Sequence, residues 1–120
     1  MSTFSRNIRP HVETELRAAV AAEGQGQPGA AFAHLERAHV LGQASTVEHT
    51  RVHWRMFLWG LRQRSARECL GQILRIVGAA TKTAFGLVPD GNTGGAGISP
   101  FKRLPVPPDL RALIERAQRR

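Results

Sequence analysis

The sequence predicts a single all-α domain made of antiparallel helical hairpins, a long Gly/Pro-rich loop and a short C-terminal helix. Apolar residues recur at three- and four-residue spacing along most of the chain. Ser45 and Ser65 each precede such a stretch and have a glutamate three positions later, which is the pattern of a capping box. No segment shows the alternation of a half-buried strand. The length of 120 residues and the 42% hydrophobic content suit one domain with its own core.

Five helices follow from this pattern, and we expect them over residues 6–23, 28–41, 46–63, 65–85 and 108–118. Pro10 falls in the opening turn of the first, where proline is tolerated, and Pro28 opens the second. Gly42 is placed to end the second helix, because glycine readily adopts the left-handed backbone angles found at helix C-termini. Residues 87–107 have no periodicity and are expected to form the long loop.

The apolar faces of two helices predict where the core lies. In the third helix one face carries five residues that we expect to be buried: Thr50, Trp54, Phe57, Leu58 and Leu61. The fourth helix is apolar over most of its circumference, which predicts a central position. The single cysteine, Cys69, lies among its apolar residues and is interpreted as a small core residue.

The charge balance suggests partners but no binding motif. The net charge is +8, which attracts phosphate and acidic surfaces. The basic residues are spread along the chain without a cluster, and tyrosine is absent, so nucleic-acid binding is the least favoured of three functions. No apolar stretch is long enough for a membrane span and no secretory leader is evident, so a cytoplasmic protein is expected.

A group of histidines and carboxylates predicts one candidate site. His49 and His53 are four residues apart and share a face of the third helix, as Glu36 and His39, three apart, do on the second. His34 points about 140° away from His39 and is left out.

An antiparallel turn near residues 42–45 would bring Glu36, His39, His49 and His53 together. Four such side chains suit a divalent metal ion such as zinc, iron or manganese. The alternative is a hydrogen-bonded polar network that joins two helices. Glu48 is assigned to the capping box. His11 and Glu15 form a further pair on the first helix, either exposed or close to the site.

The glycine-rich stretch 90–97 resembles a phosphate-binding loop, since glycines can point backbone N–H groups at an anion. However, no Gly-Lys-Ser/Thr follows and no strand precedes it, so it is not a P-loop. Two interpretations remain open: a lid over a neighbouring groove, in which Lys102 and Arg103 could bind an anion, or a structural connection to the last helix.

Two resemblances support the helical prediction. Small residues in the stretch AAFAHLERAHVL resemble the second helix of a tetratricopeptide repeat, which implies hairpin geometry for about half of the chain. The stretches HLERAHVLGQ, HTRVHWRM and VPDGNTGGAGISPFKRLPVPPDL resemble a short bacterial protein family of unknown function. That family implies no activity.

Three functions remain. The leading expectation is a small non-enzymatic binding or adaptor protein, whose first three helices form a groove for a protein or peptide; the basic charge favours an acidic partner. The second is a divalent-metal protein for storage, sensing or oxidation through Glu36, His39, His49 and His53. The third is electrostatic nucleic-acid binding.

Overall fold

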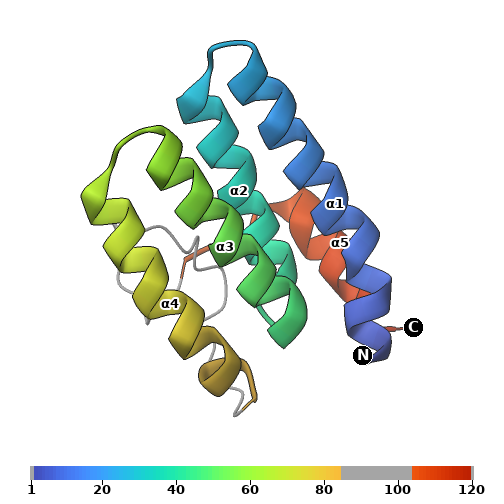
Figure 1. The fold of residues 1–120 in the computed structure, drawn as a ribbon. Coiled ribbons are helices and arrows are strands. Elements are labelled where there is room, and N and C mark those ends of the chain that lie inside the picture. The colour runs from blue at the N-terminus through green and yellow to red at the C-terminus, as the bar shows by residue number, and fades with distance from the viewer. Residues whose placement is uncertain (1, 85–103, 120) are drawn as a thin grey trace.

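The computed structural model describes the backbone of residues 2–84 and 104–119 and the side chains of residues 2–78 and 104–119. It is all-α over these ranges (Figure 1), with five helices: α1 (Thr3–Gly24), α2 (Pro28–Gly42), α3 (Thr46–Arg62), α4 (Ala66–Ala84) and α5 (Pro108–Gln118). This confirms the predicted fold class. The predicted glycine-rich stretch and the basic pair after it lie outside the described residues. None of the described helices is long and apolar enough to cross a membrane.

The helices form consecutive antiparallel hairpins (Figure 1). α1 pairs with α2 and α3 pairs with α4, while α2 and α3 lie side by side and join the two pairs. α5 returns from the far end of the sequence to pack against α1 and α2. Ion pairs connect several helices: Arg62 of α3 donates to Glu23 of α1, and Arg37 of α2 bonds both Glu15 of α1 and Asp109 of α5.

The core lies between α1, α2, α3 and α5. Among the described residues, α4 contributes none of the buried apolar side chains of this core. The core consists of Ile8, Val12, Leu16, Ala19, Ala31, Leu35, Ala38, Val40, Leu41, Val52, Met56, Leu110 and Ala117. Small residues on α2 let α1 and α3 approach it closely. α2 is therefore the central helix of the described structure, and the prediction that the fourth helix is central is wrong.

α1 begins three residues earlier than predicted because Ser2 caps it. The Ser2 hydroxyl accepts a hydrogen bond from the Ser5 backbone N–H at 3.1 Å, which satisfies one of the donors that open a helix. Pro10 consequently lies inside α1 and not in its first turn.

Gly42 has a role other than the predicted one. It is the last residue of α2, and the following Gln43 has right-handed angles, so no left-handed cap forms there. A Cβ added at Gly42 would lie 2.9 Å from the Glu48 Cβ and 3.4 Å from a Val12 methyl group. Glycine is needed here because α1, α2 and α3 meet at this point.

α3 buries a different face from the predicted one. Its buried residues are Glu48, His49, Val52, His53, Met56 and Gly60. Trp54 is half exposed and stacks on Phe57, and Leu61 is exposed as well. The polar stripe containing the two histidines therefore faces the protein interior, and much of the aromatic stripe faces solvent.

α4 packs with an unusual pattern. Gln72 is the one fully buried side chain among its described residues. Leu70, Leu74 and Val77 are instead exposed, at 64%, 74% and 72%. Cys69 is half-buried against α3, with its Sγ 3.9 Å from the Phe57 carbonyl oxygen, so the core position predicted for it is wrong. The apolar surface of α4 therefore adds little to the described core.

Candidate metal centre

Three imidazole rings meet where α2 and α3 approach each other. His39 projects from the last turn of α2, and His49 and His53 project from the first half of α3. The three ring centroids lie 4.7 Å from one another in every pair, which makes an equilateral triangle. The Nε2 atom of His49 lies 3.0 Å from the Nε2 atoms of both other histidines.

The local sequence explains this convergence. The turn after Gly42 reverses the chain, and Ser45 caps α3 by accepting a hydrogen bond from the Glu48 N–H at 3.3 Å. His39 and His49 are then level with each other on antiparallel helices, as predicted. His53 lies one turn further along α3, and its ring turns back toward His49. All three side chains are almost completely buried, with exposures of 2%, 6% and 2%.

Hydrogen bonding alone accounts poorly for the arrangement. An imidazole nitrogen has either one N–H or one lone pair in the ring plane, so it forms one linear hydrogen bond. The His49 Nε2 atom lies at hydrogen-bonding distance from two such nitrogens at once. A positive ion among the three Nε2 atoms would accept a lone pair from each of them.

α4 supplies the next layer of contacts. The Nδ1 atom of His53 lies 2.5 Å from the Gln72 side-chain oxygen, and the Gln72 amide nitrogen donates to Glu68. Neither residue was predicted as part of the site, and Glu68 was assigned only to the capping box with Ser65. The available signal was that Glu68 and Gln72 are four apart on one face of α4, a spacing typical of many exposed polar pairs.

Glu36, the fourth predicted ligand, is not part of the cluster. Among the described residues, one group of potential ligand atoms lies within 4.8 Å of one another, and it consists of His39, His49 and His53. Because the His53 ring turns back toward His49, the triangle closes around the last turn of α2. Glu36 lies a turn earlier, and its half-buried side chain lines a pocket.

The sequence matches a described family over nearly its full length. Residues 6–114 match a family described as "protein of unknown function (DUF3703)". The chain belongs to this family. No curated protein and no solved structure matches it. The resemblance to a family of unknown function is thus confirmed, while the resemblance to tetratricopeptide repeats stays a prediction. DUF3703 membership assigns no chemistry, so the candidate site rests on its own geometry.

Two other histidines of this DUF3703 protein lie outside the triangle. His34 was excluded from the site by its angle on the helix, and its Nδ1 lies 2.8 Å from the Glu15 carboxylate. Glu15 also accepts from Arg37. Glu15 therefore joins α1 to α2, and no described contact links it to His11, its predicted partner.

Glu48 only half fulfils its predicted role in the capping box. Its backbone N–H is capped by Ser45, but the Ser45 N–H bonds the Gly42 carbonyl oxygen and not the Glu48 side chain. That carboxylate is fully buried, where it accepts from Arg51 at 3.2 Å and lies 3.9 Å from the Arg9 Nε. Burial raises the pKa of Glu48, and the charge of Arg9 opposes the rise.

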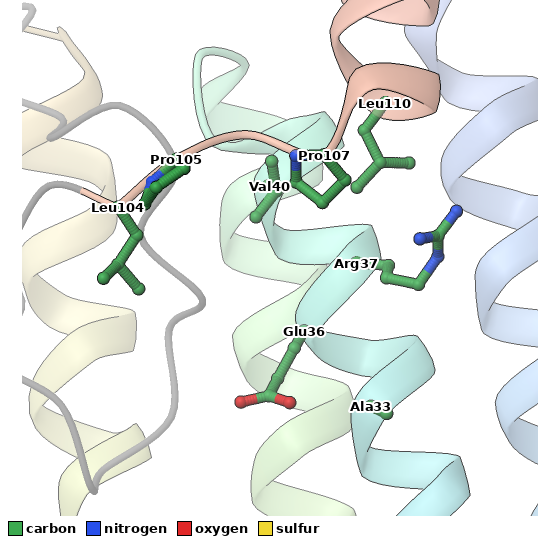
Figure 2. A pocket seen from close by; sticks show the side chains of 8 residues that line it. All are labelled: Ala33, Glu36, Arg37, Val40, Leu104, Pro105, Pro107 and Leu110. Atoms are coloured by element: carbon green, nitrogen blue, oxygen red, sulfur yellow. The ribbon is translucent and has the colours of Figure 1, made fainter.

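A pocket of about 290 Å³ opens between α2 and the segment that leads into α5 (Figure 2). Its walls are mostly apolar, and two charged residues of α2 also line it. The lining residues are Ala33, Glu36, Arg37, Val40, Leu104, Pro105, Pro107 and Leu110. Glu36 and Arg37 extend to opposite sides of the helix in this view, and Arg37 is engaged with Asp109. The pocket is bordered by the helix that carries His39, but no histidine lines it.

Proposed function

We propose that this protein binds one divalent transition-metal ion, with zinc as the preferred ion, through the Nε2 atoms of His39, His49 and His53. The observation that supports this function is the triangle of buried imidazoles whose Nε2 atoms crowd around His49. Buried polar groups are normally paired by hydrogen bonds, and here one nitrogen faces two partners. A shared ion satisfies all three nitrogens.

The distances support a first-row metal. Bonds of about 2.0–2.1 Å at angles of 90–109° place two ligand nitrogens about 2.9–3.4 Å apart. The observed Nε2 separations from His49 are 3.0 Å. The ligand atoms of all three histidines lie within 4.8 Å of one another, and changes of side-chain torsions would bring them to bonding distance of one ion.

The donor set favours zinc over manganese among the ions considered. Imidazole nitrogen suits zinc, copper, nickel and iron, whereas manganese prefers oxygen ligands. Three neutral nitrogens leave a fourth position of a tetrahedral zinc site for water or another ligand. One ion per chain suits sensing or transfer of a metal better than bulk storage.

The decisive experiment is a zinc titration of protein made without a histidine tag. Competition with a chromophoric chelator should give one high-affinity ion per chain, and zinc should raise the melting temperature. Stabilisation by a ligand grows with its excess over Kd and reaches about 2.7 kcal/mol at a hundredfold excess. Absence of stoichiometric binding and of a thermal shift would rule out the proposal.

Substitutions locate the ion. His49→Ala combined with His53→Ala should abolish binding, while His11→Ala, on α1, should leave the affinity unchanged. Circular dichroism of the metal-free proteins checks that the double variant is folded. His39→Gln provides a milder variant that keeps a polar side chain on α2. Zinc bound by all variants with the affinity of the original chain would show that the site lies elsewhere.

The adaptor role and nucleic-acid binding stay predictions. A stoichiometric partner recovered in a pull-down would support the first. Retention on heparin with a steep salt dependence would support the second.

A further inference from the structure

We propose that Gln72 and Glu68 of α4 are positioning residues for the metal centre, and that metal occupancy stabilises the attachment of α4 to α3. This inference rests on the proposed function. It adds a regulatory element to that site, because α4 touches no ion itself but holds one of the ligands.

The directions of the hydrogen bonds from His53 to Gln72 and from Gln72 to Glu68 follow from the carboxylate at which this series ends. A glutamate carboxylate has no hydrogen to donate, so the Gln72 NH₂ group must face Glu68. The Gln72 carbonyl oxygen then faces His53, and the 2.5 Å contact requires a hydrogen on the His53 Nδ1. A neutral imidazole carries one hydrogen, so the Nε2 atom of His53 is left with its lone pair directed toward His49. Glu68 and Gln72 thereby hold His53 in the form that binds a metal.

The packing of α4 makes this contact unusually important for the helix. Gln72 has no exposed surface and is the one buried side chain of α4 in the described range. The apolar residues at positions 70, 74 and 77 point outward. α4 also meets α3 at Gly60, where an added Cβ would lie 3.1 Å from the Cys69 sulfur. In the described range, α4 is thus attached to α3 by the close approach at Gly60 and by the hydrogen bond of the buried Gln72 side chain with His53.

The coupling must work in both directions. An ion on Nε2 withdraws electron density from the His53 ring and makes the Nδ1–H a stronger donor to Gln72. Any contact that favours the metal-bound state is favoured by the metal to the same degree. Zinc should therefore slow the local opening of α4.

The affinity test replaces Gln72 with an apolar side chain of similar size. Gln72→Met should weaken zinc binding about 10- to 100-fold, which is the usual effect of losing a partner of a metal-bound histidine. Gln118→Met, at an exposed glutamine of α5, should leave the affinity unchanged. Glu68→Ala frees the Gln72 amide to rotate and should give a smaller loss. Glu68 is only partly buried, so this variant is a mild perturbation of the fold.

Hydrogen–deuterium exchange provides the readout that a purely structural role of Gln72 would not change. In the original chain, zinc should slow exchange of the amides at 68–78 relative to the metal-free protein. In Gln72→Met at saturating zinc, that slowing should be lost while exchange in α1 is unaffected. Zinc bound by the original chain with unchanged affinity in both variants would overturn this inference and leave the proposed function intact. No zinc bound by the original chain would overturn both.

Discussion

Glu48 illustrates how a single buried carboxylate is accommodated at the start of α3. Its side chain has no exposed surface and is flanked by two arginines, Arg51 at 3.2 Å and Arg9 at 3.9 Å. The energy of taking a charge out of water outweighs the attraction of these partners, since the net effect is a raised pKa. The ionised form of Glu48 therefore opposes folding.

We expect Glu48→Gln to change how stability depends on pH. The folded-state pKa of Glu48 lies above its ordinary value of 4.5, so its stabilising contribution is complete below that value and is lost as pH rises through the raised pKa. The variant has no such loss. Urea unfolding at pH 4 and pH 7 should show that the variant gains stability relative to the original chain as pH rises. A constant difference between the two pH values would contradict this.

At the scale of elements, α3 shows what periodicity predicts and what it leaves open. The start of α3 was predictable because the Ser45 cap and the helical spacing agree. Its buried face was not, because the histidine stripe lies about 90° round the helix from the face with Trp54, and apolar content favoured the latter. The neighbouring helix decides the matter: α2 brings His39 against the histidine face of α3, and Gly42 lets the two helices meet closely at Glu48.

The close approach of α2 and α3 can be tested at Gly42. Gly42→Ala should destabilise the fold by about 1–3 kcal/mol, because the new methyl group would lie 2.9 Å from a Cβ that is fixed to the α3 backbone. Gly29→Ala has nothing within 4 Å and should gain up to about 1 kcal/mol from better helix propensity. Chemical denaturation measures both. Equal stability of the two variants would show that α2 and α3 can separate without loss.

At the scale of the whole molecule, α5 connects distant parts of the sequence. Leu110 is fully buried in the core with α1 and α2, and the Asn7 side chain donates to the Ala117 carbonyl oxygen at 3.1 Å. The existence of α5 was predictable from its amphipathic spacing. Its location was not, since no sequence pattern specifies which of the preceding helices it packs against.

Truncation of Leu110 tests the importance of this closure. Leu110→Ala should destabilise the protein by about 2–5 kcal/mol, the usual cost of a large-to-small change in a core. Leu74→Ala, on the solvent side of α4, should change stability by no more than about 0.5 kcal/mol. Thermal unfolding of the metal-free proteins compares them. A small effect of Leu110→Ala would mean that α5 is dispensable for the core.

The geometry of the candidate site was predictable only in part. The helical spacing and the antiparallel turn were both predicted, and together they place His39 and His49 level with each other. Each of the two depends only on local geometry. The exclusion of Glu36 depends on how the His53 ring turns back toward His49, and the inclusion of Gln72 depends on α4, whose position follows from tertiary packing. Local rules therefore found the three clustered histidines, but not Gln72 and Glu68, which extend the contacts of His53.

The three rings belong to one short piece of the chain, residues 39–53. The entropy lost on bringing chain segments together grows with the length of the loop that is closed, so this triangle is inexpensive to assemble. An ion held there would join the end of α2 to the first half of α3, which are neighbours in the sequence, and would not join remote parts of the fold. Under the proposed function, the hairpin of α2 and α3 would thus supply all three protein ligands from one short stretch of chain, with the other helices packed around it.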